Sequence, residues 1–193
     1  MLRGFALPFE RALADGVRAV SAGAPFRHMQ TPGGYSMSVA MTNCGALGWV
    51  SDPTGYRYSP IDPETRTPWP AMPAAFLELA RAAADTLAFA GFVPDACLVN
   101  RYEPGARLTL HQDKDERDFR EPIVSVSLGV PAVFLFGGSK RKDRPQRVPL
   151  QHGDVVVWGG PARLRYHGVA KLDVSSHPFA GPARINLTLR RAR

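Results

Sequence analysis

Two kinds of hydrophobic pattern divide the chain. Residues 74–90 carry apolar side chains at helical spacing, between Pro73, which is typical of a helix start, and Gly91, which is typical of a helix end. The apolar positions of this segment are Phe76, Leu79, Ala80, Ala83 and Leu87. A shorter amphipathic pattern covers residues 9–22. We therefore expect a helix over 74–90 that packs against a sheet, and a short helix over 9–22 that is interrupted near Gly16.

Short alternating segments, separated by Gly, Pro and Asp turns, occupy most of the remaining chain. The predicted strands after Pro94 are 96–102, 107–113, 123–128, 132–136, 154–158, 164–166 and 184–190. Residues 31–58 alternate in the same way around glycine turns. Residues 61–73 contain four prolines and predict an extended connector, anchored by Trp69. Many short strands at close spacing predict a sandwich or a barrel.

Length and composition are those of one globular domain. The chain has 193 residues, of which 45% are hydrophobic and 21% are charged. Its two cysteines, Cys44 and Cys97, form no Cys-x-x-Cys pattern, so we expect reduced packing residues. No apolar run reaches the length of about 18 residues that a membrane span needs, and residues 1–10 lack the features of a signal peptide. The expected location is the cytoplasm, without a membrane partner.

The charge balance favours a polyanionic partner. The formal net charge is +7, and the sequence pI is about 9.9. The most strongly charged segment is Lys140-Arg141-Lys142-Asp143-Arg144. Such a segment fits a solvated face and, if the protein acts on nucleic acid, it also fits a contact with phosphates.

Candidate metal ligands occur near residue 111. His111 and Asp113 are two positions apart, so on a β-strand both side chains would project to one face. His167 offers a third donor from a distant part of the sequence. Two imidazoles and one carboxylate are the ligand set of non-haem Fe(II) oxygenases, and zinc is the competing metal.

Residues 184–190 alternate cleanly between polar and apolar side chains. Arg184, Asn186, Thr188 and Arg190 share one face, so a half-buried strand would point two guanidinium groups inward. A buried arginine needs an anionic partner. A structural ion pair and a small dicarboxylate co-substrate both satisfy this requirement. Asn100 and Tyr102 share strand parity and could complete such an anion site.

Several segments together resemble the AlkB family of alkylated-DNA repair dioxygenases, particularly its bacterial type. They are Asn100-Arg101-Tyr102-x-Pro104-Gly105, His111-Gln112-Asp113-Lys114-Asp115-Glu116, Val124–Gly129, Phe136-Gly137-Gly138, His152–Gly160, Tyr166-His167-Gly168 and Arg184-x-Asn186-x-Thr188-x-Arg190. The resemblance extends upstream through Thr31–Tyr35, Met41–Gly45 and Tyr58–Pro63, so it covers nearly the whole chain.

The resemblance implies an iron site and a co-substrate site. The Fe(II) ligands would be His111, Asp113 and His167, which make up the catalytic centre. The residues around 2-oxoglutarate would be Asn100, Tyr102, Arg184, Asn186 and Arg190. Arg184, helped by Tyr102, would hold the distal carboxylate, and Arg190 would lie nearer the metal and Asp113. Molecular oxygen would be the second co-substrate.

The resemblance also implies a site for an extruded base. Its residues would be Met41, Trp49, Tyr56, Tyr58, Asp115 and Arg141, with Trp49 and His111 on either side of the base. Asp115 would favour lesions that carry positive charge, such as 1-methyladenine and 3-methylcytosine. Ordinary core packing of Trp49 and an exposed loop position for Asp115 are the alternatives.

The resulting prediction is a mainly β domain over 1–193 with flanking helices, folded as a double-stranded β-helix, or jelly roll. Residues 31–60 would form a nucleotide-recognition lid and 94–193 the catalytic core. The predicted function is oxidative dealkylation of bases in single-stranded DNA, with RNA as a further substrate, by a monomer. The alternatives are a dioxygenase acting on tRNA or modified nucleotides, and a non-catalytic jelly-roll binding module.

Overall fold

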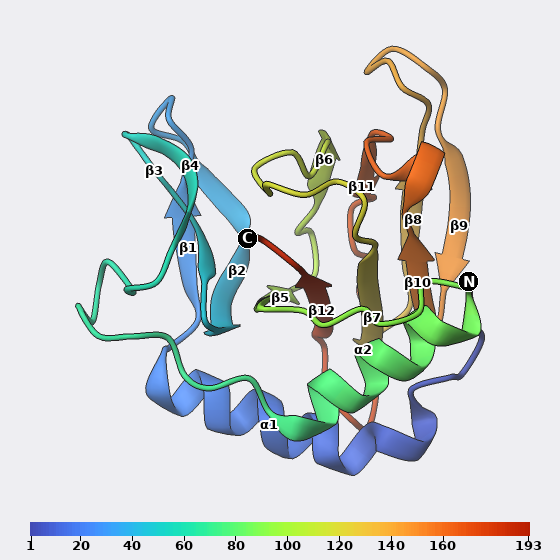
Figure 1. The fold of residues 1–193 in the computed structure, drawn as a ribbon, viewed down its shortest axis with the longest axis horizontal. Coiled ribbons are helices and arrows are strands. Elements are labelled where there is room, and N and C mark those ends of the chain that lie inside the picture. The colour runs from blue at the N-terminus through green and yellow to red at the C-terminus, as the bar shows by residue number, and fades with distance from the viewer.

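Two antiparallel sheets pack face to face and form the body of the protein (Figure 1). The computed structural model describes residues 1–193. In spatial order, the larger sheet contains β1 (Arg27–Gln30), β2 (Ser36–Gly45), β5 (Ala96–Tyr102), β12 (Arg184–Arg190), β7 (Ile123–Gly129) and β10 (Val155–Trp158). The smaller sheet contains β6 (Leu108–His111), β11 (His167–Val169), β8 (Ala132–Phe136) and β9 (Gln146–Leu150). Two buried apolar clusters join the sheets, and the predicted jelly roll is confirmed.

Two α-helices cover the outer face of the larger sheet (Figure 1). They are α1 (Glu10–Gly23) and α2 (Ala74–Thr86), and two short 3-10 turns occupy Leu7–Phe9 and Gly160–Ala162. The largest apolar cluster joins both helices to β2, β5, β7, β10 and β12. The free cysteines Cys44 and Cys97 are buried in this cluster, as expected. Neither helix is both long enough and apolar enough to cross a membrane.

Strand β12 is buried on both faces, whereas the sequence predicted a half-buried strand. All seven of its residues are buried. Ile185, Leu187 and Leu189 enter the cluster beneath the helices, and the polar residues of β12 face the smaller sheet. The predicted inward position of the two guanidinium groups is confirmed, and the strand differs from the prediction only because its apolar face is buried too.

Several boundaries differ from those predicted. The strand expected over 107–113 ends at His111, and the one expected over 164–166 lies instead at His167–Val169, after a turn. The second helix ends at Thr86 rather than at residue 90. Strands β1 and β9 were missed, because each lies at the edge of its sheet and has few buried apolar residues.

The first helix is continuous through Gly16, contrary to the predicted interruption. Gly16 is buried where α1 meets α2, and a Cβ atom there would lie 2.7 Å from Cε1 of Phe76 and 3.2 Å from Cβ of Pro73. Gly16 is needed because the two helices approach closely, and the helix does not break there.

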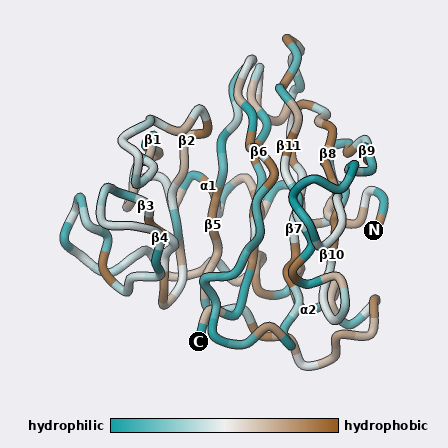
Figure 2. The backbone as a smooth tube through the Cα atoms, turned by 90° about the horizontal axis from the view of Figure 1, so that it is seen from above, coloured by the Kyte–Doolittle hydropathy of each residue, from teal (hydrophilic) through white to brown (hydrophobic).

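The connector and the β3–β4 hairpin form a lobe beside the sheets. Strands β3 (Gly48–Asp52) and β4 (Gly55–Ser59) pair only with each other and lie to one side of the body (Figure 2). Residues 62–73 contain neither helix nor strand. Trp69 is buried and donates a hydrogen bond from Nε1 to the carbonyl of Ser59, at 2.9 Å, so its predicted anchoring role is confirmed.

Substitution of Gly16 tests the close packing of the helices. Gly16→Ala raises helix propensity by about 1 kcal/mol, but the new methyl group meets the fully buried Phe76, and overpacking costs about 1–3 kcal/mol. We expect a net loss of about 1 kcal/mol in the free energy of unfolding, measured by urea denaturation. The double variant Gly16→Ala/Phe76→Leu should recover part of the loss. A Gly16→Ala protein more stable than the parent would contradict this packing.

Candidate active site

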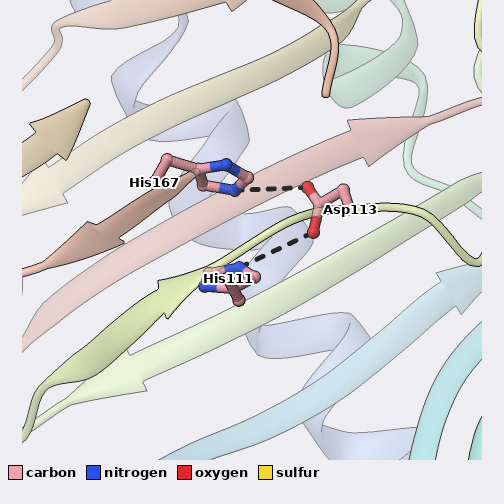
Figure 3. A group of neighbouring side chains, drawn as sticks. All are labelled: His111, Asp113 and His167. Atoms are coloured by element: carbon pink, nitrogen blue, oxygen red, sulfur yellow. Dashed lines mark ion pairs between the residues drawn. The ribbon is translucent and has the colours of Figure 1, made fainter. Parts of the chain in front are cut away.

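Three predicted metal ligands converge where β6 ends and β11 begins (Figure 3). His111 ends β6 and His167 begins β11, and the two are direct cross-strand partners. Asp113 follows β6 and places one carboxylate oxygen toward each ring, with Oδ1 3.6 Å from Nε2 of His111 and Oδ2 3.5 Å from Nε2 of His167. One donor atom from each residue lies within 4.8 Å of the others. The three side chains can therefore share one metal ion.

Backbone carbonyls fix the orientation of both imidazole rings. Nδ1 of His111 donates to the carbonyl of Thr109 at 2.9 Å, and Nδ1 of His167 donates to that of Arg165 at 3.0 Å. Each Nε2 is thereby left with its lone pair, directed toward Asp113. Burial, reinforced by His167, lowers the pKa of His111 to about 4, so this ring is neutral at pH 7 and can act as a ligand.

A local irregularity brings the ligands together. His167 pairs with His111 and Val169 pairs with Leu108, so β6 has one more residue than β11 between these pairs. Leu108 therefore packs into the interior with Val169. Gly168 permits the close approach of the strands, because a Cβ atom there would lie 2.5 Å from the carbonyl oxygen of Leu108.

Arg190 forms a buried ion pair with the metal carboxylate. Its Nε and Nη2 donate to Oδ2 of Asp113 at 3.1 and 2.8 Å. Burial by itself raises the pKa of Asp113, but Arg190, His167 and His111 together outweigh burial and hold that pKa well below its usual range. For Arg190, the structural ion pair that the sequence left open is therefore present.

Arg184 is buried without a carboxylate partner. Only 1% of the residue is exposed, Nη2 donates to Oγ of Ser127 at 3.0 Å, and Nε and Nη1 have no hydrogen-bond partner. Its guanidinium carbon lies 4.9 Å from the centre of the Tyr102 ring. Burial lowers the pKa of Arg184, as expected for a charge without a counter-ion. Two unpaired N–H groups in the interior are suited to an anionic ligand.

Asn100 and Asn186 continue the polar face between the two arginines. They are cross-strand partners on β5 and β12, and Nδ2 of Asn100 donates to Oδ1 of Asn186 at 3.2 Å. Asn186 is held further by Oγ of Ser125, which accepts from its Nδ2 at 2.8 Å. Oδ1 of Asn100 has no partner. The predicted co-substrate residues thus lie on one buried surface that extends from Arg184 to the metal ligands.

The β3–β4 hairpin contacts the segment after the metal strand. Nε1 of Trp49 donates to Oδ2 of Asp115 at 2.8 Å. The Trp49 ring stacks on Tyr56, with centroids 5.6 Å apart and planes 13° apart. Asp115 is exposed and lies in the loop beyond the end of β6, and it reaches the hairpin from there.

Tyr58 leads to a buried network that the sequence reasoning missed. Its hydroxyl donates to Oε1 of Glu116 at 2.7 Å. Glu116 lies beside Arg163 and Arg190, and Nη1 of Arg163 donates to the backbone carbonyl of Asp113 at 2.7 Å. Arg163 carried no sequence signal, because it lies in a turn outside every matched segment. Glu116 stood in the metal motif without an assigned role.

The other two predicted substrate residues lie farther from this network. Met41 is buried in the cluster that contains Tyr102, on the same side of the larger sheet as its cross-strand partner Asn100. Arg141 is exposed in the loop after β8, whose last residue, Phe136, pairs with His167. This loop therefore extends from the same end of the smaller sheet as the metal ligands.

The residues present fit a divalent metal with a dicarboxylate. Two imidazoles and one carboxylate, all oriented by second partners, match a non-haem iron site. The unpaired nitrogen atoms of Arg184 match an anionic ligand such as a carboxylate.

Comparisons with known proteins agree with this geometry. The model of the 2OG-Fe(II) oxygenase superfamily matches residues 1–190. The chain is 58% identical over 192 residues to the alpha-ketoglutarate-dependent dioxygenase AlkB of Salmonella typhimurium, covering 100% of this chain and 89% of that protein. It is 35% identical to the DNA N(6)-methyladenine demethylase ALKBH1C of Arabidopsis thaliana, covering 75% of this chain and 37% of that protein. The solved structure of OsALKBH1 superposes with a TM-score of 0.76 at 29% identity, covering 97% and 91% of the two chains.

Opposite effects on stability should distinguish the two buried arginines. Arg184→Met removes an unpaired charge, so without ligand we expect a free energy of unfolding equal to or above that of the parent. Arg190→Met removes the charged partner of the buried Asp113 carboxylate and should cost about 3 kcal/mol. In thermal unfolding with Mn(II), 2-oxoglutarate should stabilise the parent but not Arg184→Met. Equal destabilisation by both substitutions would argue against an empty anion site at Arg184.

Proposed function

We propose, because this chain belongs to the AlkB family of 2OG-Fe(II) oxygenases, that it removes alkyl groups oxidatively from N-alkylated bases in single-stranded DNA. It is an Fe(II)- and 2-oxoglutarate-dependent dioxygenase, and its second co-substrate is O2. The observation that supports the proposal most directly is the unpaired Arg184 on the buried polar surface that extends to a complete His-Asp-His set.

Each group of residues has a separate task in this mechanism. His111, Asp113 and His167 would hold Fe(II), which with 2-oxoglutarate and O2 supplies the oxidising chemistry. Arg184 would bind the distal carboxylate of 2-oxoglutarate, with Tyr102 beneath its guanidinium. Asn100, Asn186 and Arg190 would line the rest of the co-substrate.

The overall reaction needs no nucleophilic side chain. One oxygen atom of O2 enters the N-methyl group and the other enters succinate, while 2-oxoglutarate loses CO2. The N-hydroxymethyl product then releases formaldehyde and restores the base N–H or its neutral form. The protein must therefore hold the base, orient its alkyl carbon and exclude competing reactions.

The hairpin and the basic surface would supply substrate recognition. A target base must leave its stack and be held by aromatic faces, which Trp49 and Tyr56 offer at the edge of the site. Met41 and Tyr58 would shape the pocket, and Arg141 would contact phosphate. The net charge of +7 favours association with the polyanionic strand. RNA carries the same backbone charge and is the alternative substrate.

Coupled product release tests the reaction. With Fe(II) and 2-oxoglutarate, a single-stranded DNA oligonucleotide carrying 1-methyladenine should yield equal amounts of formaldehyde and succinate. Asp113→Ala should abolish both, whereas Asp85→Ala, which removes an exposed acid on α2, should leave both unchanged. Release of succinate without formaldehyde would indicate a dioxygenase with a different substrate. Faster reaction of a matched RNA oligonucleotide would favour the RNA alternative. If folded, iron-loaded protein releases neither formaldehyde nor succinate, the result would support the non-catalytic binding module.

Two substitutions of Asp115 separate charge recognition from hairpin anchoring. Asp115→Ala removes both the charge and the acceptor for Trp49, whereas Asp115→Asn keeps an acceptor. If the charge recognises cationic lesions, both variants should lose about fivefold in kcat/KM on 1-methyladenine, equivalent to about 1 kcal/mol for an exposed charge pair. Losses on neutral 3-methylthymine should be smaller. A parent-like Asp115→Asn would assign the residue to anchoring alone.

A further inference from the structure

Four charged side chains are buried together beside the proposed metal site. They are Asp113, Glu116, Arg163 and Arg190, whose side chains are between 2% and 8% exposed. Two carry negative charge and two carry positive charge. Of the four, only Asp113 belongs to the proposed ligand set, so the other three must act on it indirectly if they contribute to the site.

Glu116 contacts the same two arginines that hold Asp113. Its Oε1 lies 3.4 Å from Nε of Arg190, and its Oε2 lies 3.1 Å from Nη2 of Arg163. Arg190 donates to the Asp113 carboxylate at 2.8 Å, and Arg163 donates to the Asp113 backbone carbonyl at 2.7 Å. Each arginine therefore bridges Glu116 and Asp113, one through the side chain of Asp113 and the other through its backbone.

The charge balance explains why a second carboxylate is needed. Without Glu116, two buried guanidinium groups would share Asp113 as their only acid, and both would repel a divalent cation bound there. With Glu116, the four groups sum to zero. Arg190 can then orient Asp113 without adding net positive charge beside the metal.

The same carboxylate reaches the β3–β4 hairpin. Tyr58 on β4 donates to Oε1 of Glu116 at 2.7 Å, and Tyr58 is the cross-strand partner of Trp49. Tyr58, which lies opposite the proposed base-binding Trp49, is thus hydrogen-bonded to the network that holds the carboxylate of Asp113.

We propose that Glu116 is a positioning residue with two tasks. It balances Arg163 and Arg190 so that Asp113 remains available to a divalent cation, and it anchors the β3–β4 hairpin through Tyr58. The inference rests on the metal-binding role proposed for His111, Asp113 and His167.

Metal affinity, measured apart from turnover, tests the first task. The probe is Mn(II) alone, titrated into the full chain and followed by the electron paramagnetic resonance signal of the free ion. Glu116→Gln keeps the size of the side chain and an acceptor for Tyr58 but removes the charge. We expect it to weaken Mn(II) binding by about tenfold or more, as changes in the partners of metal ligands commonly do.

Asp62→Asn is the matched control. Asp62 is a fully buried carboxylate that accepts two hydrogen bonds of 2.7 Å from Arg27, so its substitution also breaks a buried acid–arginine pair. Neither residue contacts the four-charge network. Asp62→Asn should leave Mn(II) affinity within about twofold of the parent, even if it lowers stability to a similar extent.

Charge rescue separates electrostatic balance from packing. In Glu116→Gln/Arg163→Gln the buried set is again neutral, and the glutamine at 163 can still donate to the carbonyl of Asp113. We expect this double variant to recover most of the lost Mn(II) affinity. If Glu116→Gln alone fails to fold, the double variant and Arg163→Gln still test the charge balance. Both should bind Mn(II) nearly as tightly as the parent, or more tightly.

Tyr58→Phe tests the second task. It removes the hydrogen bond to Glu116 but leaves every buried charge in place. Amide hydrogen exchange in β3 and β4 should become about tenfold faster, while Mn(II) affinity stays within about twofold. Unchanged exchange would overturn the anchoring task.

The outcomes distinguish this inference from the proposed function. Parent-like Mn(II) affinity in Glu116→Gln, or a double variant as weak as the single one, would overturn the charge-balancing task while leaving the metal site intact. If the parent binds Mn(II) no better than Asp113→Ala, the proposed metal site itself fails, and the inference fails with it.

Discussion

Burial of two guanidinium groups on one strand is the constraint around which the interior is organised. Strand β12 lies between the helices and the smaller sheet, so Arg184 and Arg190 have no access to bulk water. Such charges are stable only with anionic or strongly polar partners. Arg190 has two carboxylates, whereas Arg184 has one hydroxyl and an aromatic ring. The difference divides the interior into a part that the protein neutralises itself and a part that a ligand would neutralise.

The proposed metal ligands depend on the part of the interior whose charges the protein itself neutralises. Asp113 lies beyond the end of β6. Arg190 holds its carboxylate and Arg163 holds its backbone, and both arginines come from much later in the chain. The histidines depend on strand pairing, because His111 and His167 are opposed only where Gly168 lets β11 approach β6. A loop and two strand ends thus form a precise site only through contacts between distant residues.

Two consecutive acids connect the β3–β4 hairpin to the segment that carries Asp113. Asp115 accepts a hydrogen bond from Trp49 at the surface, and Glu116 accepts one from Tyr58 in the interior. Both follow Asp113 within three residues, so movement of the β3–β4 hairpin would be felt at the metal segment. Such an arrangement would allow occupation of the base site to affect the metal site without any long pathway.

Alternation and turn residues by themselves predicted the strand at 184–190 and a sandwich or barrel, because these patterns are local properties of the sequence. The resemblance to the AlkB family implied the jelly roll and the ligand set His111, Asp113 and His167. Tertiary structure alone decided that both faces of β12 are buried, that Gly16 is a contact between helices, and that β1 and β9 complete the sheet edges. It also decided which arginine is paired: Arg184 and Arg190 look alike in the pattern, yet only Arg190 meets Asp113 and Glu116. Charge pairing depends on distances between residues far apart in the chain, and no local pattern contains those distances.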